Sequence, residues 1–281
     1  MWGKIKDMRK FFNKAIKNPV SISVIALFGA FLIWWIWLHL IISNVSAYSL
    51  LLWSDVYQLV ALFGAIFGFI ASRRWGGSKS FIGRSIIAFS IGLLFQCFGQ
   101  SAFGYYQHLL QVQVPYPSIA DVGFFGSIIF YIYGALMLAK VSRIELSWKF
   151  IGSKIHLILF PLIMLSLSYI ILLQGYQFDW SHPIKIFLDF GYPLVEAVSI
   201  SIILLAFSLS QQKLGGALKT PIIFFIMALV SIYLSDFVFL YLVNNGSWYV
   251  GGINDLMYLV SYILMAFSLI LLSIWPSILP E

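Results

Sequence analysis

A repeated unit constrains this chain more than any other feature of its sequence: an aspartate followed by a long apolar run. The aspartates recur at spacings of 66, 68 and 66 residues, at Asp55, Asp121, Asp189 and Asp255. Each precedes a mostly apolar stretch of about 20 residues, the length that an α-helix needs to cross the roughly 30 Å core of a bilayer. Because every unit would have the same orientation, the period predicts four parallel repeats of a helix pair rather than inverted repeats.

The composition is that of a membrane protein and excludes a soluble one. Of the 281 residues, 61% are hydrophobic and 10% are charged, whereas soluble domains carry about 25% charged residues. The apolar runs are continuous and lack the alternation of membrane β-barrels. We therefore expect an all-α integral membrane protein, with one domain of eight transmembrane helices over residues 20–281. The expected spans are Val20–Ile42, a run from Asp55 to Ser72, Phe81–Phe103, Asp121–Ala139, Ile155–Leu173, Ile186–Leu209, Pro221–Val243 and Ile253–Trp275.

Basic residues lie on one side of the expected spans. Sixteen of the seventeen lysines and arginines stand at the same ends of alternate runs, and only Lys185 stands at the other ends. Such loops follow the positive-inside rule, which predicts cytoplasmic N- and C-termini in a multi-pass protein of the cell membrane. Topology thus explains the net charge of +7, and we expect membrane lipids rather than nucleic acid as partners. The single cysteine, Cys97, excludes an internal disulfide.

An amphipathic segment precedes the first run, over residues 1–19. Its apolar side chains recur at helical spacing among lysines, and Asn18-Pro19 ends the pattern. The apolar positions are Trp2, Ile5, Met8, Phe12 and Ile16. This pattern predicts an interfacial helix whose cations face anionic lipid headgroups.

The repeated aspartates have a structural and a functional interpretation. At a helix start, an aspartate accepts hydrogen bonds from free backbone N–H groups, and Ser118-x-x-Asp121 has the spacing of a capping box. Capping does not explain Tyr192 and Tyr258, each of which stands three residues after its aspartate. We expect these side chains to line an outer-facing polar and aromatic vestibule. Its candidate ligand-binding residues are Asp121, Asp189, Tyr192, Asp255 and Tyr258.

Four further polar residues lie inside the expected spans, where polar side chains usually face a protein interior. They are Gln96, Gln100, Glu196 and Asp236. At a rise of 1.5 Å per residue, Glu196 and Asp236 would lie about 15 Å and about 10 Å below the outer ends of neighbouring helices. We expect these four residues to form a ligand-binding polar core, in which the two carboxyls share a proton or hold a cation. A structural hydrogen-bonded pair is the alternative.

Histidines suggest a second kind of site. His39, His108 and His182 all fall on the expected outer side, and three histidines with a carboxylate would suit Zn²⁺ and hydrolytic chemistry. However, the sequence has no HxxxH or HExxH spacing and no GxSxG motif. We therefore expect no metal and no cofactor, with the three histidines as the alternative ligand set.

The segment PYPSIADVGFFGSIIFYIYGALML resembles part of the N-terminal multi-pass membrane regions of prokaryotic sensor proteins of the histidine-kinase and diguanylate-cyclase type. The segments LDFGYPLVEA and INDLMYLVSY, each of which contains a repeated aspartate and a tyrosine, fit the same pattern. The matching positions are Pro117, Ser118, Asp121, Asp189, Tyr192, Asp255 and Tyr258. The resemblance implies a sensor in signal transduction. Because Glu281 follows the last run almost at once, without an output domain, we expect signalling through a separate cytoplasmic partner.

These observations favour a membrane sensor or ligand-binding module without catalysis, whose outer-facing vestibule binds a small-molecule or lipid ligand. Two other functions remain open. One is a metal-dependent membrane hydrolase that uses the outer histidines and aspartates, and the other is a small-solute transporter. The sequence does not decide between them.

Overall fold

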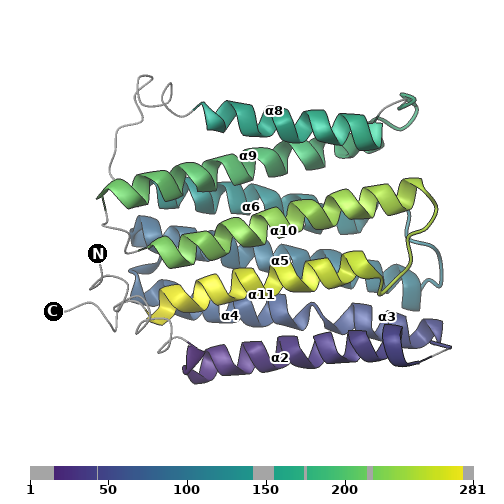
Figure 1. Ribbon diagram of the computed structural model, residues 1–281, viewed down its shortest axis with the longest axis horizontal. Helices are drawn as coiled ribbons and strands as arrows, with labels where there is room; N and C mark the ends of the chain where they lie inside the picture. The colour runs from purple at the N-terminus through teal and green to yellow at the C-terminus, as the bar shows by residue number, and fades with distance from the viewer. Residues whose placement is uncertain (1–15, 43, 142–154, 174–175, 214–217, 275–281) are drawn as a thin grey trace.

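The computed structural model describes residues 16–42, 44–141, 155–173, 176–213 and 218–274, and within these ranges every regular element is a helix. The long helices run along one common axis and form an elongated bundle (Figure 1). They are α2 (Pro19–Ile36), α3 (Ala47–Val56), α4 (Leu59–Arg74), α5 (Phe81–His108), α6 (Ile119–Val141), α8 (His156–Ser168), α9 (Pro183–Lys213), α10 (Lys219–Asn244) and α11 (Ile253–Ile274). Short helices η1 (Trp37–Ile41), η2 (Gly77–Lys79) and η3 (Tyr169–Leu173) join or extend them.

Seven helical stretches in the described ranges are long and apolar enough to cross a membrane. They are Pro19–Ile41, Ala47–Arg74, Phe81–His108, Ile119–Val141, Pro183–Ser208, Lys219–Val243 and Ile253–Ile274. Large apolar side chains such as Ile33 and Ile129 are exposed on the outside of the bundle, as lipid contact requires. The prediction of an all-α, multi-pass membrane protein is therefore confirmed at this level.

The fifth expected span, Ile155–Leu173, forms a shorter apolar helical stretch than the other spans. Its residues form α8 and then the π-helix η3, and Pro161 lies inside α8. The apolar helical stretch covers Ile158–Ile171, which is shorter than the other seven. The predicted interfacial helix over residues 1–19 lies mostly outside the described residues. At its end, the Asn18 side chain accepts the N–H of Val20 at 3.0 Å and caps α2.

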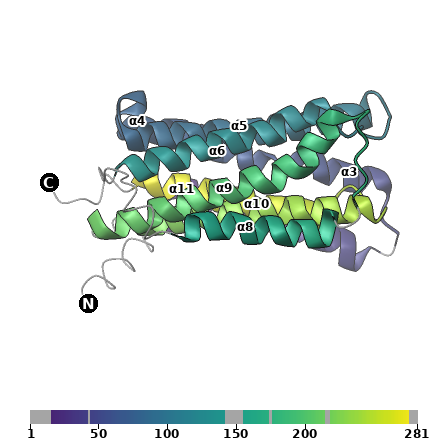
Figure 2. The same ribbon diagram turned by 90° about the horizontal axis from the view of Figure 1, so that it is seen from above.

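Six helices pack side by side in a closed ring. In order, these are α4, α5, α6, α9, α10 and α11, and α11 packs back against α4. Helix α2 lies outside the ring against α11 and α4, and α8 lies outside it along α9. Figure 1 shows α8 and α2 at opposite edges of the bundle, and Figure 2 shows α8 from above, in front of the helices that it covers. The ring therefore encloses the interior where polar groups can be shielded from lipid.

Close helix crossings in the ring depend on residues without bulky side chains. A Cβ atom at Gly123 of α6 would lie 2.4 Å from the backbone nitrogen of Gly99 in α5. A Cβ atom at Gly64 of α4 would lie 2.7 Å from the Cβ of Ala266 in α11. Such small residues let membrane helices approach closely and gain van der Waals contact, which drives helix association in lipid.

The second span begins earlier than the sequence predicted. We expected it to follow Asp55, but α3 already starts at Ala47 because the Ser46 hydroxyl caps it and accepts the N–H of Ser49 at 3.1 Å. A short break separates α3 from α4, and there the side chain of Gln58 donates to the carbonyl of Asp55 at 2.8 Å. Asp55 therefore lies at the end of α3 and does not begin a span.

The bundle has two distinct ends, which are visible at the right and left of Figure 1. The pocket end is formed by residues 109–118, 176–182 and 245–252, which connect neighbouring helices. The basic end is formed by residues 75–80 and the adjoining helix ends. Its cationic residues in the described ranges are Lys17, Arg73, Arg74, Lys79, Arg84, Lys140, Lys213 and Lys219.

Candidate ligand-binding pocket

A cavity of about 210 Å³ lies at the pocket end, bounded by residues of α3, α5, α6, α9, α10 and α11 and by the connection from α5 to α6. Seven of the nine candidate binding residues line this cavity, although they come from distant parts of the sequence. They are Gln100, Asp121, Asp189, Tyr192, Asp236, Asp255 and Tyr258. Gln96 and Glu196 do not line it and lie in the protein interior, where they are 2% and 4% exposed. The fold thus gathers most of the candidate residues in one place.

Asp255 joins the start of α11 to α3. It accepts the backbone N–H of Gly251 at 2.7 Å and the hydroxyl of Ser54 at 3.3 Å. The side chain of Gln100 in turn donates to the backbone carbonyl of Ser54 at 3.0 Å. Asp255 is in the first turn of α11 and thus fits the predicted capping position. Its contacts also fix one wall of the pocket.

A network of hydrogen-bonded polar side chains lies below the pocket, in the interior of the ring. The hydroxyl of Tyr57 donates to the amide oxygen of Gln100 at 3.3 Å. Deeper in the ring, Gln96 accepts the hydroxyl of Tyr262 at 3.0 Å and donates to the hydroxyl of Ser127 at 2.8 Å. Gln96 therefore connects α11, α5 and α6 and does not reach the cavity.

Asp121 combines both roles that the sequence suggested. One carboxylate oxygen accepts the backbone N–H of Ser118 at 2.7 Å, as in a capping box. The other accepts the hydroxyl of Tyr192 in α9 at 3.0 Å. The tyrosine ring also packs edge-on against Phe125 at a centroid distance of 5.3 Å. The aspartate thus caps α6 and links it to α9 at the wall of the pocket.

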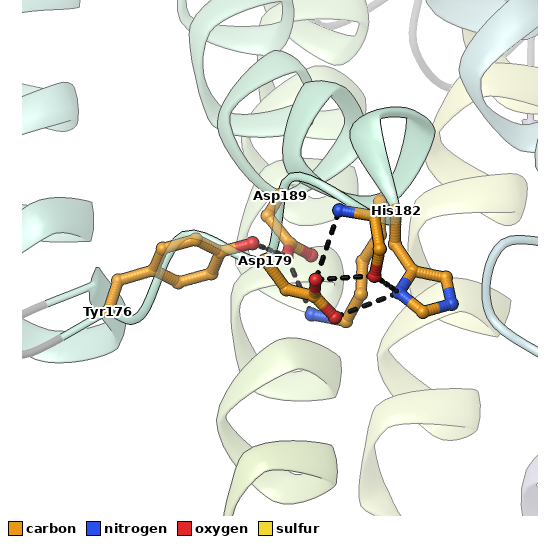
Figure 3. A network of polar contacts seen from close by, with 6 residues as sticks. Tyr176, Asp179, His182 and Asp189 are labelled. Atoms are coloured by element: carbon orange, nitrogen blue, oxygen red, sulfur yellow. Dashed lines mark hydrogen bonds and ion pairs between the residues drawn. The ribbon is translucent and has the colours of Figure 1, made fainter.

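Asp189 lies inside the first two turns of α9, which begins at Pro183, and does not cap the helix. It is 6% exposed and accepts hydrogen bonds from Tyr116 at 2.9 Å, from Tyr176 at 2.7 Å and from Lys185 at 2.8 Å. Figure 3 shows Tyr176 approaching this carboxylate. Burial and the Asp189 carboxylate raise the pKa of both phenols above the usual tyrosine value, so both remain protonated donors.

A second polar cluster lies beside Asp189 but outside the pocket (Figure 3). Asp179 accepts hydrogen bonds from the hydroxyl and backbone N–H of Ser181 and contacts the ring of His182 at 2.8 Å. These hydrogen bonds lower the pKa of Asp179 to about 2. Both Asp179 and His182 are well exposed, so the cluster orders the loop before α9.

Glu196 and Asp236 are in contact, from α9 and α10. The two carboxyl groups lie close enough to interact electrostatically, and Asp236 also accepts the hydroxyl of Tyr258. Asp236 faces the cavity, whereas Oε1 of Glu196 is buried and has no hydrogen-bond partner.

The three candidate metal-binding histidines do not come together. His39 stacks on Trp35 at a centroid distance of 4.1 Å, His108 contacts Asp55, and His182 contacts Asp179. Across the described ranges, no group of three or more His, Cys, Asp or Glu side chains is arranged to hold a metal ion. The alternative ligand set is therefore not assembled in this fold.

Several pocket residues were missed by the sequence analysis. Ser54, Asn254, Trp248, Lys185 and Tyr116 all line the cavity. The only sequence signal for Asn254 was its place beside a repeated aspartate, and Tyr116 stood in the same motif as Asp121. Asn254 is 1% exposed, and its Oδ1 has no hydrogen-bond partner. The Nε1 of Trp248 is also buried and unpartnered.

The pocket thus combines carboxyls, amides and phenols with aromatic rings, which is the composition of a binding site for a small molecule. Its walls come from helices that are far apart in the sequence, from α3 to α11. Comparisons with family models, with curated proteins and with solved structures gave no match, so a function can be inferred for this chain only from the geometry of the pocket.

Proposed function

We propose that this protein is a membrane sensor or ligand-binding module and that its pocket binds a small ligand. One observation carries the proposal: the cavity of about 210 Å³ is lined by polar and aromatic side chains from six helices. Concave sites between helices, with a few convergent polar groups on a largely apolar wall, are the usual binding sites of small molecules. The unpartnered Asn254 and Trp248 atoms add unused hydrogen-bonding capacity in the wall.

We further propose that the pocket faces the outside of the cell. The arginines and lysines of the basic end, among them Arg73, Arg74 and Lys140, stand opposite the pocket end. By the positive-inside rule, the basic end is then cytoplasmic. In this arrangement α8 with η3 is the eighth span, the four helix pairs are parallel repeats, and both termini are cytoplasmic.

The sensor role rests on the length of the helices that form the pocket. Helix α10 runs from the basic end to the pocket end, and α11 runs back. They remain joined near the basic end, where the hydroxyl of Ser268 donates to the carbonyl of Pro221 at 2.7 Å. A ligand that shifts the helix ends at the pocket would therefore shift the opposite ends, where a cytoplasmic partner could respond.

A small-solute transporter is the second candidate. It is favoured by the Glu196–Asp236 pair, because a buried acidic pair below a binding pocket can exchange a proton or cation. A metal-dependent hydrolase receives no such support, since the candidate histidines have separate local partners.

The orientation is tested by thiol labelling in intact cells. The tested variant is Val243→Cys, which lines the pocket mouth and is 41% exposed, in a Cys97→Ser background. We expect a membrane-impermeant maleimide to label it from outside, whereas the matched control Lys79→Cys at the basic end should react only after permeabilisation. Labelling of the control in intact cells would contradict the proposed orientation.

The same label tests the sensor role. With the maleimide bound at Val243→Cys, we expect hydrogen exchange in residues 75–80 at the basic end to change relative to the unlabelled variant. A fully labelled protein with unchanged exchange there would overturn the sensor role and leave a binding module. Accumulation of a solute in sealed liposomes that contain only the purified protein would instead favour the transporter.

A further inference from the structure

We infer that the ligand is a small organic cation, a primary or secondary ammonium attached to an apolar, ring-sized body. The inference rests on the proposed function, because it specifies what the same pocket binds. It combines three observations: an excess of carboxyls, an unpartnered buried acceptor, and a wall of aromatic rings.

The pocket has more acidic than basic side chains. Four carboxyl residues line it, against the single cation of Lys185. Lys185 is already paired with Asp189 at 2.8 Å. Within the described ranges, Asp121, Asp236 and Asp255 form no ion pair. The carboxyl groups of the pocket therefore outnumber its cations, and a bound cation would pair with one of them.

The uncompensated carboxyls have the capacity to bind a further donor. A carboxylate offers about four lone-pair positions. Asp236 accepts a hydrogen bond from Tyr258, and both Glu196 and Asp121 lie close enough to interact with it electrostatically. An ammonium group between α6 and α10 would contact Asp236 and reduce the repulsion from Asp121. An isolated charge at membrane depth is costly, so a paired cation is strongly favoured there.

Asn254 indicates the kind of cation independently of the carboxyls. Its Nδ2 donates to Asp255 at 3.4 Å, which orients the amide because the oxygen would be repelled by that carboxylate. The oxygen Oδ1 is left buried without a partner in the pocket wall. Since an unpaired buried acceptor is unfavourable, the ligand should supply an N–H donor. A quaternary ammonium has none.

Aromatic rings form the remainder of the wall. Trp248 is held edge-on between Phe103 at 5.7 Å and Phe239 at 5.8 Å, and Tyr258 and Phe124 also line the cavity. Aromatic faces attract ammonium groups by cation–π interaction and pack well against an apolar ring. Among the described residues, the Nε1–H of Trp248 is buried without a hydrogen-bond partner.

Size and geometry argue against other cations. The cavity of about 210 Å³ is below the roughly 300–1,000 Å³ of typical ligand pockets, which limits the ligand to about one ring and a short chain. A metal ion needs several converging ligands, and no such group occurs in the part of the chain that the structure describes. A one-ring amine satisfies both limits.

The test uses three probes of nearly equal size with different charge. They are 2-phenylethylammonium, the neutral 2-phenylethanol and the anionic phenylacetate. Each is titrated calorimetrically into the purified full chain in lipid nanodiscs, and the shift in Tm is measured in parallel. We expect the ammonium to bind at one site per chain and to raise Tm, and the other two probes to bind at least about 10-fold more weakly, because they lack a hydrogen bond between charged groups.

Two variants locate the binding. Asp236→Asn and Asp121→Asn keep the shape of the side chain and remove its charge, and each should weaken ammonium binding by about 10- to 100-fold. The matched control is Asp179→Asn, which removes a carboxylate at the same end of the bundle but outside the pocket and should leave binding unchanged. The Tm without probe shows whether each variant is folded, so that binding is compared only between folded proteins.

The outcomes separate this inference from the proposed function. If 2-phenylethanol or phenylacetate binds as tightly as the ammonium and the pocket variants weaken it, the cation inference is wrong while the proposed function stands. If no probe binds, or if neither folded pocket variant weakens ammonium binding, the cation inference is overturned. The proposed function then depends on the separate labelling of Val243→Cys.

Discussion

The two halves of the helix ring are held together in different ways. Towards the basic end, packing is close and mostly apolar, with Gly64 against Ala266 and Gly68 against Ser90 and Leu269. Towards the pocket end, helices are joined by hydrogen bonds between side chains, and a cavity separates them. Small residues allow close approach in the first half. In the second half α5 and α6 also approach closely at Gly99 and Gly123, but acidic and aromatic side chains from the other helices surround a cavity.

The difference indicates that the two halves of each helix have different mechanical properties. A closely packed half supplies rigidity, because deformation would lose many van der Waals contacts at once. A half with a cavity and hydrogen-bonded walls can rearrange by exchanging a few partners. The same helices can thus provide a stable frame at one end and a binding site at the other. Four substitutions test this contrast, from the largest expected effect to the smallest.

The largest effect is expected from Gly64→Val in the closely packed half. The new side chain would meet the Cβ of Ala266 at 2.7 Å and its Cα at 3.0 Å, so α4 and α11 must separate. We expect a loss of about 3 kcal/mol of stability, as for overpacked cores, measured by thermal unfolding in detergent. The control Gly29→Val on α2 has no atom within 4 Å of the new Cβ and should be nearly neutral. Equal losses in both variants would contradict the contrast.

Asp255→Ala should have the next largest effect, in the pocket half. It removes the acceptor of the Gly251 N–H and of the Ser54 hydroxyl, both of which then lie buried without that partner. We expect unfolding to become easier by about 2 kcal/mol. Asp255→Asn, which keeps one acceptor oxygen, should lose less than half of this. If the two variants were equally stable, the hydrogen bonds would not hold α11 to α3.

A smaller loss of stability is expected when the hydrogen bond between α6 and α9 is removed. The hydroxyl of Tyr192 donates to Asp121 at 3.0 Å, and Tyr192→Phe removes only that group. A double-mutant cycle with Asp121→Asn should give a coupling energy of about 1 kcal/mol. Tyr241→Phe, whose side chain is 48% exposed and does not line the pocket, is the control for loss of a phenol and should show no coupling. A coupling near zero for Tyr192 would show that this wall is held by packing alone.

The smallest loss of stability concerns Asp179 in the exposed loop, and it disappears in acid. Hydrogen bonds lower the folded-state pKa of this carboxyl to about 2, against about 3.9 in an unfolded chain. Its contribution is therefore complete above about pH 4 and is lost as the pH falls through about 2. Wild type and Asp179→Asn should differ slightly in Tm above this window and converge within it. A difference that grows in acid would contradict the assignment.

Much of the fold and of the pocket lining could be predicted from the sequence. Long apolar runs are sufficient to locate seven membrane-length helices, because a chain in lipid must satisfy its backbone within each segment. Asp121, Asp189 and Asp255 could be grouped because each lies near the start of a helix at the same end of the bundle. The antiparallel arrangement of neighbouring helices then placed Glu196 beside Asp236.

Other features depend on contacts that no local pattern contains. The start of α3 at Ala47 lies eight residues before the predicted span at Asp55, although Ser46 is a good N-cap. Asn254 could not be singled out from the sequence, because its Oδ1 is distinguished only by the lack of a hydrogen-bond donor among the described residues. Asp55 was grouped with the other repeated aspartates by spacing alone, yet in the fold it contacts His108 and does not line the pocket.

The closure of the ring by α11 has a consequence for how the protein is made. The last helix of the ring packs against α4, one of the earliest, and Asp255 reaches back to Ser54 across 201 positions of the chain. A membrane protein is inserted from its N-terminus during synthesis. Until α11 enters, Ser54 of α3, which is hydrogen-bonded to Gln100 of α5, lacks the partner that α11 supplies. Insertion of α11, rather than of each earlier helix, is therefore the step at which these groups are sealed from lipid, and a chain interrupted before α11 would leave them exposed to quality-control proteases.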